Sequence, residues 1–291
     1  MIIKLFIFLV LPFYLNTTTL QQKENNKEQR IVFQLDDKKI LEQLLYAFKD
    51  DKNTPISDLI VKVGTFFKET PYKSATLEIN PNEEKLVINL REMDCTTFAE
   101  NVLAISRTIK SGNPTFEKFA AELQNIRYRD GKIDGYSSRY HYFIDWIFEN
   151  NRGKTVKSVS KEIGGTLYPK IINFISTHPD SYLQLKNHPG MIKTIADREK
   201  EISARETYFI PKEKIGDFES KLKEGDIVGI TSRVEGLDIS HVGILVRKDG
   251  RIHLMHASTV SKKVIVSEET LEDYLLKSKS VTGIMVARPI E

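Results

Sequence analysis

The sequence predicts an α+β fold in which helices come first and an antiparallel sheet follows. Helical spacing of apolar residues is clearest in the first half of the chain, whereas the last third consists of short Val- and Ile-rich runs bounded by Gly, Asp, Ser and Lys. No internal repeat or low-complexity tract is present, and Pro and Gly are not pooled into a linker. We therefore expect residues 30–291 to form a single domain with insertions.

Composition excludes several classes of protein. The 291 residues include 43 Lys and Arg against 40 Asp and Glu, with 40% hydrophobic and 29% charged residues. These values are typical of a globular chain and exclude a disordered protein, a collagen and a multi-span membrane protein. No basic stripe is present, so we expect no nucleic-acid partner. Cys95 is the single cysteine, which excludes an internal disulfide framework and a multi-cysteine zinc site.

The N-terminus has the layout of a secretory signal peptide. Lys4 precedes the apolar run 5–15, and a polar, Gln-rich stretch follows. This apolar run is too short to span a bilayer comfortably. We expect a signal peptide over residues 1–20, a flexible linker over 21–29, and export to the periplasm. A buried N-terminal helix is the alternative.

Apolar spacing predicts two helices. The first covers Cys95 to Lys110, and its buried face should carry apolar residues at steps of four, three and four. These residues are Phe98, Val102, Ile105 and Ile109. Asp94 stands where an N-cap belongs, so Cys95 should lie in the first turn. A second helix is predicted over Ser138 to Asn150.

Five short strands are predicted in the last third of the chain, in the pattern of an antiparallel meander. They cover residues 226–230, 241–246, 252–258, 264–266 and 284–288. Between the second and third strands, Asp249-Gly250 is a two-residue turn of the primed kind. If Lys248 and Arg251 flank this turn, Val246 faces His253 and every opposed pair is fixed.

This register predicts a pair of neighbouring histidines. His241, Gly243, His256 and Ser258 share one face, and His253 falls on the other. His256 is then the diagonal neighbour of His241, about 7–8 Å away between backbones. Gly243, directly opposite His256, should leave room for a ring or a substrate. A β-bulge would shift the register by one and exchange the roles of His253 and His256.

Cys95 is the candidate nucleophile. Unpaired N–H groups and the helix dipole favour the thiolate, so we expect a thiol pKa below the reference of about 8.5. The same N–H groups can hold an oxyanion. A cysteine nucleophile needs a histidine base and a group that orients the base; we assign His241 as the base and His256 as the orienting residue. The alternatives are a small core cysteine and strand histidines without a role.

These motifs resemble the NlpC-type cell-wall cysteine hydrolases, which have a papain-like fold. The resemblance rests on Met-Asp-Cys95-Thr-Thr-Phe-Ala, His241-Val-Gly-Ile, His256-Ala-Ser, and Thr-Pro-Tyr72 ahead of the cysteine. It implies a papain-like NlpC-type core with the cysteine at a helix start and a C-terminal antiparallel sheet. It also implies that the Tyr72 hydroxyl reaches the active site, although the residues alone favour a core aromatic. The usual Cys-Ser-Gly is replaced by Cys95-Thr-Thr.

The long separation of Cys95 from His241 requires an insertion at about residues 111–224. This arrangement, with Ser138–Trp146 inside the insertion, is similar to a branch of N-acetylmuramoyl-L-alanine amidases of bacterial cell-wall turnover. It implies a hydrolase that cleaves the amide between (anhydro-)N-acetylmuramic acid and L-Ala in muropeptides. No metal, cofactor or obligate protein partner is implied, and we expect a monomer. A stem-peptide endopeptidase cutting after D-Glu and a catalytically silent wall-binding module are the alternatives.

Selectivity for a sugar requires an aromatic platform with hydrogen-bonding groups nearby, and the insertion supplies both. The candidates are Arg139, His141, Tyr142 and Trp146. Because Tyr142 and Trp146 are four residues apart, they also fit the buried stripe of a helix. We therefore predict only Arg139 and His141 as substrate contacts.

Overall fold

The structure, a computed structural model, describes residues 31–291. The expected signal peptide and linker, residues 1–29, lie outside the described residues. Within the described part of the chain, none of the helices combines the length and apolar character needed to cross a bilayer.

Helices occupy most of the first two thirds of the described chain. They are α2 (Leu35–Ala47), α3 (Ile56–Phe66), α4 (Cys95–Lys110), α5 (Phe116–Arg127), α6 (Phe143–Arg152), α7 (Ser160–Ile163), α8 (Phe174–Thr177), α9 (Leu183–Asn187), α10 (Met191–Ser203), α11 (Ile215–Phe218) and α12 (Leu271–Lys277).

The strands are short before residue 212 and longer after it. They are β1 (Ile31–Val32), β2 (Leu86–Val87), β3 (Val156–Ser158), β4 (Thr166–Leu167), β5 (Tyr208–Pro211), β6 (Ile227–Ser232), β7 (Ile239–Lys248), β8 (Arg251–Ser258), β9 (Lys263–Thr270) and β10 (Val281–Pro289). All five predicted strands are confirmed; β6 begins one residue later than predicted and ends two residues later, and the other four extend beyond their predicted bounds. The mixed α+β class with an antiparallel sheet is confirmed as well.

The main sheet has eight antiparallel strands in the order β4-β5-β10-β6-β7-β8-β9, with β3 paired to β10. Strands β6 to β9 form the predicted meander, whereas β10 returns to pair with β6 on its other side. The insertion therefore contributes β3, β4 and β5 to this sheet. A separate two-stranded parallel pair joins β1 and β2.

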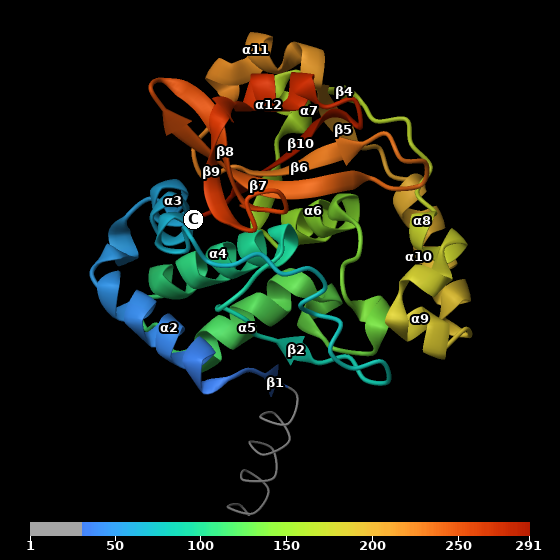
Figure 1. The fold of residues 1–291 in the computed structure, drawn as a ribbon, viewed down its shortest axis with the longest axis horizontal. Helices are drawn as coiled ribbons and strands as arrows, with labels where there is room; N and C mark the ends of the chain where they lie inside the picture. The colour runs from blue at the N-terminus through green and yellow to red at the C-terminus, as the bar shows by residue number, and fades with distance from the viewer. Residues whose placement is uncertain (1–30) are drawn as a thin grey trace, which may run out of the picture.

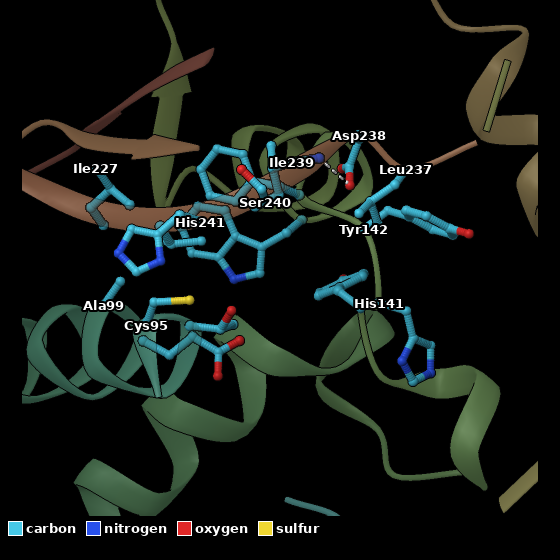
Figure 2. A pocket seen from close by; sticks show the side chains of 16 residues that line it. Cys95, Ala99, His141, Tyr142, Ile227, Leu237, Asp238, Ile239, Ser240 and His241 are labelled. Carbon is cyan, nitrogen blue, oxygen red and sulfur yellow. Dashed lines mark hydrogen bonds between the residues drawn. The ribbon is translucent and has the colours of Figure 1, made fainter. Parts of the chain in front are cut away.

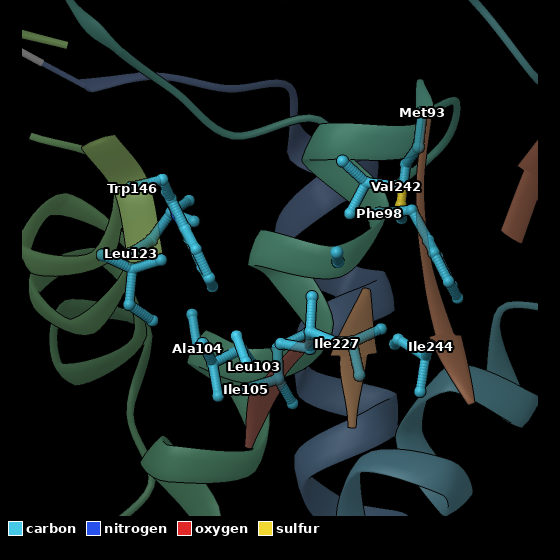
Figure 3. Packing of buried hydrophobic residues seen from close by; sticks show 14 of the residues in the cluster. Met93, Phe98, Leu103, Ala104, Ile105, Leu123, Trp146, Ile227, Val242 and Ile244 are labelled. Atoms are coloured by element: carbon cyan, nitrogen blue, oxygen red, sulfur yellow. The ribbon is translucent and has the colours of Figure 1, made fainter. Parts of the chain in front are cut away.

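Two apolar layers hold the sheet between helices (Figure 1). The larger layer packs α3 to α6 against one face, and the smaller one lies under α7, α11 and α12 on the other. Figure 3 shows Phe98 and Leu103 of α4 beside Ile227 and Ile244 of the sheet. Full burial of side chains of this size stabilises the fold by about 1.5–3 kcal/mol each.

Helix α4 has the predicted bounds and the predicted buried face. Phe98, Val102 and Ile105 are fully buried. The Thr97 N–H donates to Asp94 Oδ1 at 2.8 Å, and the Asp94 N–H donates to the Thr97 hydroxyl at 3.0 Å, which closes a capping box. The start of α4 is therefore fixed by side-chain bonds immediately before Cys95.

The second predicted helix begins later than expected. Arg139 and Tyr142 have extended backbone, Arg139 bridges to Tyr128, and α6 starts at Phe143. The cap of α6 comes from a distant part of the sequence, because Asp238 Oδ2 accepts from the Ile144 N–H at 2.9 Å. Periodicity alone could not locate a helix start set by a residue 94 positions away.

The β7–β8 hairpin has the predicted register. Val246 pairs with His253 and Lys248 with Arg251, and both turn residues Asp249 and Gly250 have positive φ. The ladder stops at the pair Ile244 and Met255, so the two strands separate beyond it. Helix α4 packs against both strands.

The expectation for Gly243 was wrong. A Cβ at Gly243 would lie 2.5 Å from Leu254 Cδ1, so the missing side chain makes room for Leu254 and not for a ring or a substrate.

Candidate active site

A pocket of about 190 Å³ lies between the start of α4, the start of α6 and the start of β7. Its lining is mainly aromatic and aliphatic, with a few polar groups: Cys95, Thr96, Ala99, Glu100, Tyr140, His141, Tyr142, Phe143, Trp146, Ile227, Leu237, Asp238, Ile239, Ser240, His241 and Val242. Figure 2 shows Cys95 and His241 next to each other at one end of this pocket. The volume is below the roughly 300–1,000 Å³ typical of ligand pockets, so it suits one compact group.

Cys95 is the first residue of α4 and is partly exposed to the pocket. Burial raises the pKa of its thiol to about 11, and the Asp94 carboxylate adds to the rise. The Val242 and Thr96 backbone N–H groups, together with the Thr96 hydroxyl, oppose it. The expected low pKa is therefore wrong, because desolvation and Asp94 outweigh the donors at the helix start. A pKa of about 11 favours the protonated thiol at pH 7.

His241 and His256 form the predicted pair just beyond the end of the β7–β8 ladder. His241 Nε2 lies 2.5 Å from His256 Nδ1, and the two rings meet edge to face. Burial lowers the pKa of His241 to about 3, with the His256 charge as a second cause, and burial lowers the pKa of His256 to about 4. Both imidazoles are therefore neutral at pH 7.

A bulge between β6 and β7 lies directly beside His241. Ile230 pairs with His241 and Thr231 with Ile239, so Ser240 is the extra residue. The bulge affects the pairing of β7 with β6 and leaves the pairing of β7 with β8 unchanged. The roles of His253 and His256 are therefore not exchanged. His253 instead bonds the Ser267 carbonyl through Nδ1 at 3.0 Å.

Two tyrosines stand near the cysteine. The Tyr72 N–H donates to the Lys262 carbonyl at 2.8 Å, and Tyr72 bridges to Met93, two residues before Cys95. Burial raises the pKa of Tyr72, with smaller effects from Cys95 and Asp94, so its hydroxyl is a donor at neutral pH. Tyr274 of α12, which the sequence did not reveal, packs edge to face on His256 with ring centroids 5.7 Å apart.

Arg139 does not lie in the pocket. Its guanidinium is buried and forms ion pairs with Glu78 and Glu84, the latter at 3.3 Å. It also lies over the Tyr136 ring. Burial lowers the pKa of Arg139, but Glu84 and Glu78 outweigh it and raise the pKa overall. The prediction of a substrate contact is corrected, because this cation is absent from the pocket lining and is paired with carboxylates of the protein.

His141 lies at the far end of the pocket with its ring turned away from Cys95 (Figure 2). Its Nε2 bonds the Tyr136 carbonyl at 2.8 Å. Tyr142 is also engaged, since its hydroxyl donates to Glu199 at 2.7 Å and accepts from the Ile175 N–H at 2.9 Å. Both residues border the pocket, but His141 Nε2 and the Tyr142 hydroxyl are bonded to other residues of the insertion.

Three further polar residues line the pocket without having been predicted as site residues. Asp238 is buried and caps α6. Burial raises its pKa to about 6, although the hydrogen bonds from the Ile144 and Ile239 N–H groups lower it. Glu100 is buried and salt-bridged to Arg127. Trp146 is buried and stacks on Phe143 at 5.4 Å. Glu100 follows Cys95 by five residues on the same helix, and this spacing could have identified Glu100 as a residue near the site.

The arrangement suits attack by sulfur on a carbonyl carbon. A thiol at a helix start faces an imidazole whose ring is held by a second imidazole, and N–H donors lie beside the sulfur. Within residues 31–291, no cluster of three or more His, Cys, Asp or Glu side chains has the geometry of a metal site.

Comparison with known proteins gives a consistent pattern. A family model described as N-acetylmuramoyl-L-alanine amidase-like matches residues 62–284. The structure of an N-acetylmuramoyl-L-alanine amidase from Bacteroides uniformis is 38% identical, with a TM-score of 0.78 over 81% of this chain and 99% of that one. No curated protein matches the chain.

Two further solved structures are similar. A Bacteroides fragilis protein provisionally described as a xylanase is 41% identical, with a TM-score of 0.74 over 78% of this chain and 99% of that one. A Legionella pneumophila protein is 20% identical, with a TM-score of 0.62 over 95% of this chain and 97% of that one, a likeness of fold alone.

Proposed function

Because the chain belongs to the N-acetylmuramoyl-L-alanine amidase-like family of cell-wall hydrolases, we propose that it is a cysteine amidase acting on muropeptides. The bond cleaved joins the lactyl carbonyl of (anhydro-)N-acetylmuramic acid to L-Ala. The observation that carries the proposal is the position of Cys95 beside His241, whose ring contacts His256. We further propose that the protein has a papain-like core of the NlpC type and that residues 30–291 form one catalytic domain.

In this proposal His241 is the general base, and its contact with His256 supports a specific role for each ring nitrogen. Its Nε2 faces His256 Nδ1, which leaves Nδ1 of His241 for the thiol proton. Only one proton can lie between the two rings. When His241 donates it, the His241 Nδ1 lone pair is free to accept from Cys95, and His256 carries its own proton on Nε2. His256 thereby selects the active tautomer, a positioning role.

Acylation begins when Cys95 Sγ bonds to the lactyl carbon while its proton moves to His241 Nδ1. The neutral resting pair delays charge separation until attack, when the imidazolium and the oxyanion form together. The Cys95 N–H and the Tyr72 hydroxyl are the proposed oxyanion donors. The imidazolium then protonates the L-Ala nitrogen, the C–N bond breaks, and a thioester with Cys95 remains.

Deacylation uses the same groups in reverse. His241 takes a proton from water, the hydroxide oxygen bonds to the thioester carbon, and Cys95 leaves as the thiol after regaining the proton. The products are a free lactyl carboxylate on the sugar and a peptide with a free L-Ala amine.

A glycosidase role, as the Bacteroides fragilis neighbour's description would suggest, requires two available carboxyl groups. The pocket has Glu100 and Asp238, but both Asp238 oxygens accept backbone N–H groups, so at most one carboxyl group is available. We therefore propose the amidase reaction and not glycoside hydrolysis. The proposed setting is outside the cytoplasm, with residues 1–20 as the export signal.

The direct test compares wild type with Cys95→Ala on a purified muropeptide and a sugar-free stem peptide, with products identified by mass spectrometry. Wild type should release the intact peptide from the muropeptide and should leave the sugar-free stem peptide uncut. Cys95→Ala should cleave the muropeptide at least about 10³-fold more slowly. Cleavage of the sugar-free peptide would instead indicate the endopeptidase. Failure to cleave either substrate would indicate the silent wall-binding module.

A further inference from the structure

The pocket contains a buried hydrogen-bond donor with no protein acceptor. Trp146 is 5% exposed and lines the pocket, and its Nε1 has no acceptor among residues 31–291. Its ring is held by parallel stacking on Phe143, with centroids 5.4 Å apart. An unpaired buried donor costs about 1–3 kcal/mol, so its retention in the wall of a pocket indicates a ligand acceptor.

A buried acceptor lines the same pocket. Glu100 is 2% exposed, and its Oε2 accepts from Arg127 Nε at 2.6 Å. Arg127 is held in turn by the Val87 carbonyl at 2.7 Å. In the described part of the chain, no side chain or backbone group donates to Glu100 Oε1, so one carboxylate oxygen stays available.

We propose that Trp146 Nε1–H and Glu100 Oε1 form a donor and acceptor pair that binds a secondary amide of the substrate. The indole N–H donates to the amide carbonyl, and the carboxylate accepts from the amide N–H. A hydroxyl group also offers both functions, but one oxygen atom would have to reach both partners. An amide presents its acceptor and donor on separate atoms.

This inference rests on the proposed function, which identifies the amide. Cys95 attacks the lactyl carbonyl attached to C3 of the muramic acid ring, and the acetamido group is on the neighbouring carbon C2. Glu100 and Cys95 lie on the same helix and border the same pocket, whose small volume admits one compact group. The assigned ligand group is therefore the N-acetyl group of the sugar, and Trp146 and Glu100 are specificity-determining residues.

The test is a double-mutant cycle in which one change removes the Trp146 donor and the other removes the N-acetyl group of the substrate. Wild type and Trp146→Phe are each assayed on a muropeptide and on the same compound lacking the N-acetyl group. Trp146→Phe removes the donor but keeps an aromatic ring against Phe143. We expect it to lower kcat/KM about tenfold on the acetylated substrate, mainly through KM, and by less than twofold on the deacetylated one.

Ile239→Val is the matched control, because Ile239 lines the pocket and has no polar side-chain atom. Its effect should be equal on the two substrates. Glu100→Gln, tested after its thermal midpoint shows a folded protein, should also lose more on the acetylated substrate.

Three outcomes separate the claims. Larger losses on the acetylated substrate for Trp146→Phe, but not for Ile239→Val, support the pair. Equal losses of Trp146→Phe on both substrates overturn it while leaving the amidase assignment intact. Absence of sugar release by wild type overturns the proposed function itself.

Discussion

The two regions that border the pocket use their polar side chains in opposite ways. At the open end of the β7–β8 hairpin, Cys95 and His241 present reactive atoms that are not saturated by structural bonds. In the insertion, Arg139, His141 and Tyr142 are equally polar, but each is bonded to protein groups. The comparison shows that chemistry is carried by polar groups which the fold leaves available.

The sharpest test of this contrast at the hairpin end is His241→Asn. Loss of the base should lower kcat about 10²- to 10⁴-fold, because His241 is the imidazole beside the thiol in the pocket, and the folded structure should persist. Steady-state kinetics with far-UV circular dichroism measures both. The control is His188→Asn, which should match wild type, and a His241→Asn enzyme with normal kcat would refute the assignment of the base.

In the insertion, Arg139→Ala should act on stability and not on catalysis. Removing the buried cation leaves Glu78 and Glu84 uncompensated, at a cost of about 3 kcal/mol in unfolding free energy. Urea denaturation measures the loss. Lys39→Ala, at the exposed pair with Asp36, should cost less than about 1 kcal/mol. A changed KM for Arg139→Ala with unchanged stability would instead support a substrate contact.

His256→Gln should have an intermediate effect, since it changes the orientation of His241 and not the base itself. We expect kcat to fall about 10- to 100-fold with little change in KM. The difference from His241→Asn is the informative quantity. If His256→Gln and His241→Asn cost the same, His256 would have more than a positioning role.

The raised thiol pKa predicts how Cys95 responds to pH. Only the thiolate is alkylated, and with a pKa of about 11 its fraction grows as pH rises. The iodoacetamide rate should therefore increase about tenfold per pH unit between pH 7 and 9. A rate already at its plateau at pH 7 would show a stable thiolate and contradict the neutral resting pair. A cysteine tripeptide, with a pKa of about 8.5, is the reference.

The sequence predicted the parts of the fold that depend on local signals. The N-cap at Asp94, the buried face of α4 and the turn at Asp249-Gly250 were all confirmed, because each depends on neighbouring residues. The turn then fixed the register, and the register brought His241 and His256 together. Local signals were therefore sufficient to predict the contact between His241 and His256, which are fifteen residues apart.

Other features depend on distant partners and could not be predicted from local signals. The start of α6 is set by Asp238, and Arg139 is ion-paired with Glu78 and Glu84. The thiol pKa depends on burial at the meeting of α4 and β7, which outweighs the helix dipole. Helix and strand assignments were therefore more predictable than the electrostatics of the site.

The central claim is that Cys95 carries the sugar half of the substrate as a thioester. Acid quenching of wild type during turnover of a defined muropeptide, followed by intact-protein and peptide mass spectrometry, tests it directly. The account predicts a transient adduct on Cys95 with the mass of the muramoyl group. An adduct with the mass of a peptide fragment, or turnover without any adduct on Cys95, would contradict it.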